Sequence, residues 1–215
     1  MSDSALVRYL PILLQATVVT VYLSAMVVTG GTVLGVVLAL LGRRARPVGL
    51  VVDVFVYVMR GVPLLVHVFA AYFWLPMLLT DVSKVTAVTL AMSLYMAAFV
   101  AEIVRGAIEG ISRTLSDAAR SLGMPPALAM RRVVLPLAVR AAMPPLMNRM
   151  VMAIKGTSLA SAVGLWELSL AGREIIQRDL APFQVFGLIA VLYFCLCTLV
   201  THAGRRLEAR FAYEH

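Results

Sequence analysis

The sequence predicts an all-α, polytopic membrane protein with five transmembrane helices in a single domain, residues 1–215. Hydrophobic residues make up 61% of the chain and charged residues 14%, and the mean hydropathy is +0.92, which is too apolar for a soluble domain of this size. Long intervals without charge are separated by short basic clusters. The net charge of +8 is therefore distributed as in a membrane protein, and not as one basic face for nucleic acid.

Four spans follow directly from the uncharged intervals. A helix rises about 1.5 Å per residue, so about 20 apolar residues cross the hydrocarbon core. The interval between Lys84 and Glu102 has only 17 residues, but its flanking charged side chains can reach the headgroups. We therefore expect transmembrane helices at about residues 12–41, 61–79, 84–104 and 182–204.

A fifth span, at about 146–166, is predicted from charge, because Arg149 and Lys155 interrupt its hydropathy. With five spans, three basic segments lie on the same side and hold 14 of the 19 Lys and Arg residues, against four on the other side. The positive-inside rule then predicts an inner-membrane protein with its N-terminus outside and its C-terminus in the cytoplasm. The three segments are residues 43–46, 105–155 and 205–210.

Two features concern packing between the spans. Residues 47–59 are apolar but too few for another crossing, so we expect an interfacial or packed helix there. In the first span, Gly31 and Gly35 are four residues apart, a spacing that lets two helices approach closely. Because this spacing is common by chance, the simplest interpretation is that it lines a packed bundle.

The segment 112–136, between the third and fourth spans, is predicted to begin with a short helix over residues 115–122. Thr114 and Asp117 have the spacing of a capping box, with Asp117 near the positive end of the helix dipole. Gly123 suits the left-handed position that follows a helix. These residues predict one short, well-delimited cytoplasmic helix.

Prolines frame a second helix in the same segment. Pro125 and Pro126 can start it, and we expect Pro136 to stop it. The resulting hairpin has small residues that permit close approach and arginines at its rim, so it could dock into a groove on a cytoplasmic partner. The alternative is a loop that only connects two spans.

The hairpin contains a run of fixed spacing, which reads Asp117-Ala118-Ala119, three residues, Gly123, nine residues, then Val133-x-Leu135-Pro136. This run resembles the EAA motif of ABC-importer permease subunits, E-A-A-x3-G-x9-I-x-L-P, with Asp for Glu and Val for Ile. Four longer stretches resemble the polar amino-acid uptake permeases, the histidine, glutamine, glutamate, arginine and opine group. These stretches are Met59–Pro76, Ala97–Ile111, Pro144–Leu168 and Gly204–Phe211.

The resemblance implies a permease subunit of an ATP-driven, binding-protein-dependent importer that forms the path for a polar amino acid or opine-like compound. It implies a second permease subunit, two ATPase subunits and an extracytoplasmic solute-binding protein as partners. The chain has no G-x-x-x-x-G-K-[ST] motif, so we expect no cofactor here and no enzyme activity, with ATP and Mg bound by the separate ATPase. The implied ATPase-coupling residues are Asp117, Ala118, Ala119, Gly123, Leu135 and Pro136.

Polar side chains inside the spans are candidates for the substrate path, because desolvating them is costly and such groups are often functional. Two structural alternatives stay open. Ser and Thr often hydrogen-bond back to their own helix, and a lone histidine in a bundle is usually structural. The candidates are His67, Ser93, Tyr95, Thr157, Ser158 and Ser161.

Three positions depart from the pattern of the family that the chain resembles. That family usually has Gln at the position of His67, Asn or a small polar residue near Tyr95, and often an acidic or amide residue at Gly156. Each change removes or alters a ligand for an amino-acid head group. The second permease subunit is the same chain or, as these departures favour, a different one.

Charged residues at the expected cytoplasmic ends of spans two and three are candidates for an inner gate. They are Arg60, Glu102 and Arg105, and the last two lie three residues apart on one helix. Anchoring at the lipid headgroups is the alternative.

A second class of function is half of an ion-coupled secondary transporter. It predicts acidic residues inside the spans for cation coupling, and the uncharged intervals contain none. A membrane-bound enzyme would need a cluster of nucleophile, base or metal ligands, which the sequence also lacks. The identity of the transported amino acid or opine stays open.

Overall fold

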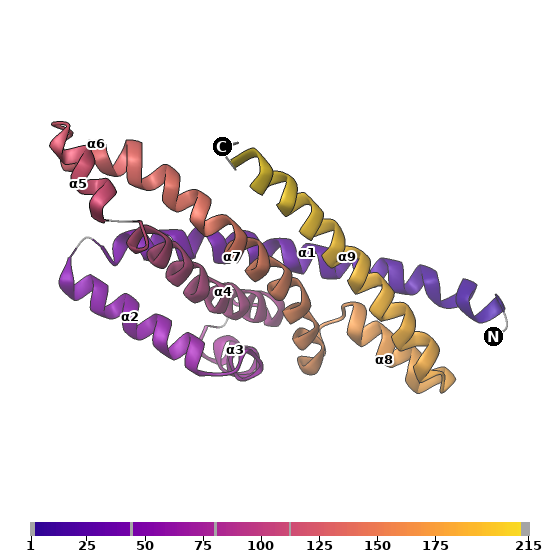
Figure 1. The fold of residues 1–215 in the computed structure, drawn as a ribbon. Coiled ribbons are helices and arrows are strands. Elements are labelled where there is room, and N and C mark those ends of the chain that lie inside the picture. The colour runs from indigo at the N-terminus through magenta and orange to yellow at the C-terminus, as the bar shows by residue number, and fades with distance from the viewer. Residues whose placement is uncertain (1–2, 44, 80, 112, 212–215) are drawn as a thin grey trace.

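The computed structural model describes residues 3–43, 45–79, 81–111 and 113–211, which form an elongated bundle of helices without a strand among them (Figure 1). The predicted all-α, polytopic fold is confirmed. The elements are α1 (Asp3–Leu41), α2 (Arg46–Gly61), α3 (Leu64–Leu78), α4 (Lys84–Glu109), α5 (Arg113–Ser121), α6 (Pro126–Ala129), a π-helical turn (Met130–Val134), α7 (Leu135–Gly156), a 3-10 helix (Thr157–Val163), α8 (Leu168–Asp179) and α9 (Pro182–Phe211).

Three helices of the described chain are long and apolar enough to cross a membrane alone, namely α1 from Arg8, α4, and α9 up to Arg206. The helices α2 and α3 meet this requirement only as a pair, bent by 103°. At the predicted fifth span the structure has the 22-residue helix α7, which contains Arg140, Arg149 and Lys155. This charge explains why hydropathy alone does not identify α7 as a span.

The predicted span over residues 61–79 contains one helix, α3, which a sharp bend separates from α2. The helix α3 has 15 residues, about 22 Å at 1.5 Å per residue, which is shorter than the roughly 30 Å core of a bilayer. The break arises at Pro63, which disfavours helical backbone at the residue before it, and Val62 is extended with φ −107° and ψ 136°. The predicted packed helix at 47–59 is present as α2.

The core forms where α1 lies against α4. A Cβ on Gly31 would come within 2.6 Å of the Met96 Cβ, and one on Gly35 within 2.5 Å of the Val100 Cβ. The two glycines therefore permit a helix contact that any larger residue would block. The interpretation of the Gly31 and Gly35 pair as a packing feature is confirmed.

The hairpin after α4 forms largely as predicted, and Gly123 has a φ of +80°. The Met124 N–H donates to the Ala119 carbonyl at 3.2 Å, and the Gly123 N–H donates to the Arg120 carbonyl at 2.9 Å. These two bonds are the Schellman arrangement that ends helices at a left-handed glycine. Because α5 already begins at Arg113, Thr114 lies inside the helix, and its side chain lies outside the part of the molecule that the structure describes.

The predicted stop at Pro136 is wrong, because the helical path continues from α6 through the π-turn into α7. The Leu135 N–H donates to the Met130 carbonyl, five residues earlier. A proline in a regular α-helix lacks a donor, and its ring collides with the carbonyl four residues before it. The wider π-turn directly before Pro136 relieves this collision. The described part of the predicted coupling-helix loop 112–136 is therefore helical except at residues 122–125, and the helix of span four starts well before residue 146.

The far end of span four also differs from the prediction. The α-helix ends at Gly156 and the path continues as a 3-10 helix to Val163, followed by Gly164 with φ +79°. The helix α8, which was not predicted from the sequence, then packs against α1 and α9 through a second core cluster. Its residues are Tyr9, Leu13, Ala16, Leu168, Ala171, Ile175, Val185 and Ile189. Figure 1 shows α8 and the α5–α6 hairpin at opposite ends of the molecule.

Candidate functional site

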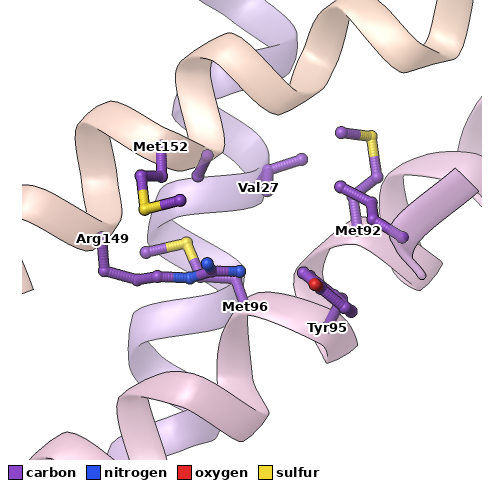
Figure 2. A pocket seen from close by; sticks show the side chains of 8 residues that line it. Val27, Met92, Tyr95, Met96, Arg149 and Met152 are labelled. Atoms are coloured by element: carbon purple, nitrogen blue, oxygen red, sulfur yellow. The ribbon is translucent and has the colours of Figure 1, made fainter. Parts of the chain in front are cut away.

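A partly open cavity of about 140 Å³ lies between α4 and α7, and α1 and α3 each contribute one residue to its wall (Figure 2). Apolar and methionine side chains form most of its wall, while Tyr95 and Arg149 bring the polar groups. The lining residues are Val27, Leu64, Met92, Tyr95, Met96, Arg149, Met152 and Ala153.

Arg149 is the charged residue of this wall. Its guanidinium carbon lies 3.7 Å from the centroid of the Phe99 ring and 5.2 Å from that of Tyr95, so cation–π attraction holds it against α4. Its Nε is buried and has no hydrogen-bond partner among the described residues. Sequence reasoning treated Arg149 only as an interruption of span four. A charge inside a span was the available signal that could have made it a candidate for the path.

Tyr95 is the predicted path residue that the structure places in the cavity wall, and His67 lies beside it. The ring centroids of His67 and Tyr95 are 5.7 Å apart. The His67 Nε2 is 3.3 Å from the carbonyl oxygen of Met59, on the other side of the break between α2 and α3. This contact favours the structural alternative for His67, because it ties the two bent helices together.

The remaining predicted path residues do not line this cavity, and each hydroxyl bonds back to its own helix. The Ser93 hydroxyl donates to the Thr89 carbonyl at 2.8 Å, and a Cβ on Gly30 of α1 would lie 3.2 Å from its oxygen. Thr157 is fully buried. The hydroxyls of Thr157, Ser158 and Ser161 donate to the carbonyls of Ile154, Lys155 and Ser158 at 2.7, 2.7 and 2.6 Å.

The predicted gate residues form ion pairs across two helices instead of along one. Arg60 at the end of α2 pairs with Glu102 of α4, and Arg105 of α4 pairs with Asp53 of α2. The Arg60 guanidinium carbon also lies 5.2 Å from the centroid of the Phe99 ring. The pairs therefore join α2 to α4, next to the aromatic ring that also holds Arg149.

The hairpin presents part of the predicted coupling set at its surface. Asp117 and Ala118 are exposed on α5, whereas Ala119 is buried. Leu122, directly before Gly123, is 80% exposed, which is unusual for a large apolar side chain at a charged tip.

Two members of the predicted coupling set lie apart from this tip. Leu135 and Pro136 are exposed, but they belong to the start of α7. The π-turn and the start of α7 are held to α4 by a small core in which Ile108 packs with Val134 and Ala138.

Glu167 is a buried group that sequence reasoning missed. It lies between the 3-10 helix and α8 and is fully buried. Its Oε1 accepts from the backbone N–H of Ser169 at 2.8 Å and of Leu170 at 3.0 Å, and its Oε2 accepts from the Tyr193 hydroxyl at 2.9 Å. Burial raises the pKa of this carboxyl, and these hydrogen bonds oppose the shift.

Thr20 of α1 joins the same network. Its hydroxyl oxygen accepts from the Leu168 N–H at 3.0 Å and lies 3.4 Å from the Oε2 of Glu167. The network therefore links α1, α8 and α9 at the end of the molecule opposite the hairpin.

Comparison with known proteins identifies the family. Residues 31–213 match the family described as the binding-protein-dependent transport system inner membrane component. The glutamine transport system permease protein GlnP of Escherichia coli (strain K12) is 35% identical over 214 residues, which cover 96% of each chain. The nopaline transport system permease protein NocM of Agrobacterium fabrum (strain C58) is 31% identical over 212 residues, covering 94% of this chain and 88% of that protein.

Solved structures agree with the sequence relatives. An amino acid ABC transporter crystallised with histidines has a TM-score of 0.90 and 29% identity, covering 98% of this chain and 99% of that one. The methionine ABC transporter MetNI, at 20% identity and a TM-score of 0.69, shows the shared fold alone. The resemblance to importer permeases of the amino-acid and opine group is confirmed. The chain belongs to the family of inner-membrane components of binding-protein-dependent transport systems.

Proposed function

We propose that this chain forms the translocation path for an amino-acid-type compound in an ATP-driven importer, with the cavity between α4 and α7 as part of that path. The observation that carries this proposal is that Tyr95 and Arg149 bring polar and charged groups into an otherwise apolar cavity wall. Desolvated polar groups at such a position usually serve a ligand. The relatives named for glutamine and nopaline transport support an amino-acid-type substrate.

The hairpin at α5 is proposed as the contact with separate ATPase subunits, which bind ATP and Mg. Exposed Asp117, Ala118 and Leu122 offer one charged, one small and one apolar contact on a short, rigidly ended helix. The hairpin can transmit motion of a partner to α4 and α7, because Val134 of the π-turn that follows it packs with Ile108 of α4 and Ala138 of α7. Leu135 and Pro136 would act by fixing the hairpin on α7.

The proposed orientation places the hairpin in the cytoplasm and the N-terminus outside. The arrangement of the bundle supports this orientation. The basic segments follow α1, include the α5–α6 hairpin and end α9, and these parts lie toward one side of the molecule, whereas α8 lies toward the other (Figure 1). A solute-binding protein would then deliver substrate at the end where α8 lies. Exposed apolar side chains of α1 and α9 would face lipid or a second permease subunit.

We propose a different chain as that second permease subunit. Of the three positions that depart from the family pattern, His67 is held by the Met59 carbonyl. A Cβ added at Gly156 would lie 3.3 Å from the Cδ2 of Leu64, so a side chain there would meet an apolar neighbour. Neither position offers a head-group ligand in this chain. If a transporter purified with two copies of this chain and no other permease still carries out binding-protein-dependent uptake, this part of the proposal is wrong.

The experiment for the coupling contact is ATP-dependent uptake and substrate-stimulated ATPase activity in proteoliposomes. Gly123→Arg places a bulky side chain at the left-handed position of the tip and should abolish stimulation. Gly123→Asn is the matched control, because Asn tolerates left-handed backbone and is small, so it should retain most activity. Unchanged stimulation in Gly123→Arg would contradict the coupling role, and uptake driven by an ion gradient without ATP would contradict the proposed function.

A further inference from the structure

We infer that Arg149 determines the specificity of the path and selects a substrate of net negative charge, an acidic amino acid in preference to a cationic one. The inference rests on the proposed function, since it concerns the same cavity. It names the class of substrate that the family relationship leaves open.

Arg149 has contacts that hold its charge without neutralising it. The rings of Phe99 and Tyr95 attract the guanidinium through their faces, at 3.7 and 5.2 Å. Aromatic faces accept no conventional hydrogen bond, whereas a guanidinium carries five N–H donors in a planar fork. The buried Nε has no hydrogen-bond partner among the described residues. The side chain is therefore positioned for a ligand and retains donor capacity.

The carboxylates that join α2 to α4 are already engaged by other cations. Glu102, one turn along α4 from Phe99, pairs with Arg60, and Asp53 pairs with Arg105. Within the described part of the chain, no ion pair joins Arg149 to an acidic side chain. The rest of the cavity wall is Tyr95 and apolar residues. The cavity thus has an excess positive charge in surroundings of low polarity, where charge–charge interactions are strong.

A carboxylate is the group that best matches this arrangement. It can accept two parallel N–H bonds from a guanidinium, a geometry that the ammonium of lysine cannot reproduce. The cavity of about 140 Å³ is smaller than the roughly 300–1,000 Å³ of typical drug-sized ligand pockets, so it suits one small molecule close to Arg149. An anionic amino acid cancels the charge of Arg149, a zwitterion leaves it unchanged, and a cationic amino acid adds to it.

Ligand binding by the transporter itself tests the inference. The complete transporter, with both permease subunits and the ATPase, is placed in lipid nanodiscs without the solute-binding protein, so that only the selectivity of the permeases is measured. Radiolabelled L-glutamate, L-glutamine and L-arginine are the probes in equilibrium binding. We expect the wild type to bind L-glutamate at least tenfold more tightly than L-arginine.

Two variants of Arg149 separate specificity from folding. Arg149→Gln should weaken L-glutamate binding at least tenfold and bring the ratio of the L-glutamate and L-arginine affinities close to one. Arg149→Lys keeps the positive charge but loses the planar fork of guanidinium N–H donors. It should bind L-glutamate more weakly than the wild type does, but still more tightly than it binds L-arginine. Arg206→Gln is the control, because Arg206 is an exposed arginine of α9 that does not line the cavity. It should change neither the L-glutamate affinity nor the ratio of the L-glutamate and L-arginine affinities. If the Arg149→Gln transporter does not assemble, the ratio of the L-glutamate and L-arginine affinities in Arg149→Lys tests the inference.

Three results would overturn the inference. These are a wild type that prefers L-arginine, an Arg149→Gln variant that loses affinity for all three probes equally, and an Arg149→Lys variant without preference. Each leaves the proposed function intact if the wild type still imports an amino acid in proteoliposomes with its binding protein. A wild type that does not bind L-glutamate would overturn the inference. A transporter that, with its binding protein, imports no amino acid or opine at all would overturn the proposed function as well.

Discussion

The guanidinium of Arg149 on α7 lies against the ring of Phe99 on α4, with 3.7 Å between its carbon and the ring centroid. The same ring has Arg60, at the end of α2, 5.2 Å from its centroid. Phe99 is therefore the point at which the cavity wall meets the ion pairs that join α2 to α4. A substitution in the cavity wall should therefore affect the ion pairs between α2 and α4, and a substitution in those ion pairs should affect the cavity wall.

Phe99→Leu should destabilise the protein, because it removes the cation–π contact while keeping a large apolar side chain. We expect a loss of about 1 to 2 kcal/mol, or roughly 2 to 8 °C in apparent unfolding temperature for a chain of this size. Thermal unfolding of the detergent-purified protein measures this. Phe183→Leu, at a side chain that is 90% exposed, is the control. Equal shifts for both variants would show that the Phe99 contact contributes nothing specific.

Gly35→Val should prevent the close approach of α1 and α4. A Cβ there would lie 2.5 Å from the Val100 Cβ and 2.7 Å from the Ala97 carbonyl oxygen, so the helices must move apart. Overpacking of this kind costs typically about 1 to 3 kcal/mol, which thermal unfolding can detect. Gly187→Val is the control, because no atom lies within 4 Å of a Cβ built on that residue of α9. A well-folded Gly35→Val protein of unchanged stability would contradict the observed packing.

Charge reversal tests the ion pair between Arg60 and Glu102. Glu102→Arg brings two cations together and should lower the apparent unfolding temperature. The double variant Arg60→Glu with Glu102→Arg restores an opposite-charge pair and should recover most of the loss. The pair is about 40% exposed, so its own contribution is small, about 1 kcal/mol or less. If the double variant is no more stable than Glu102→Arg, the pair does not join α2 to α4.

Glu167 should make stability depend on pH. Burial raises its pKa above the ordinary value of 4.5, so the folded protein holds this proton more tightly than the unfolded chain does. The associated stability is fully present below pH 4.5 and is lost as the pH rises through the raised pKa. In Glu167→Gln the amide does not titrate, so the unfolding temperature should fall less between acidic and neutral pH. A pH dependence identical to that of the wild type would contradict this.

Glu167→Ala should be far more harmful than Glu167→Gln. It removes the acceptor of two backbone N–H groups at the start of α8 and leaves the Tyr193 hydroxyl without this partner. Loss of a helix cap and of buried hydrogen bonds together should cost about 2 to 4 kcal/mol. Thermal unfolding of the two variants at one pH compares them, and equal losses would show that the cap is unimportant.

The sequence predicts features with a local cause well. Gly123 adopts the left-handed backbone expected of it, since only a glycine-like residue ends α5 this way. The close packing at Gly31 and Gly35 also follows from their spacing on one helix face. The long helix α7 overlaps the first half of the predicted fifth span, because the charge distribution depends on topology and not on side-chain contacts.

Features that depend on distant partners could not be predicted in this way. Pro136 is compatible with a helix only because a π-turn precedes it. Glu102 was expected to interact with Arg105 three residues on, but the helix α2 offers each of them a partner of opposite charge. Arg149 and Glu167 become significant only through the groups that other helices place around them, and their sequence neighbours do not reveal those groups.

The most direct test of the central claim, that this chain is a permease driven by an ATPase docked at α5, is photo-cross-linking in the assembled transporter. Benzoylphenylalanine replaces Leu122, the 80% exposed residue of the hairpin tip, and Phe183 at the start of α9 serves as the control site. We expect an adduct with the ATPase subunit from position 122 and none from position 183. An assembled, ATP-hydrolysing transporter in which position 122 yields no ATPase adduct would contradict the claim.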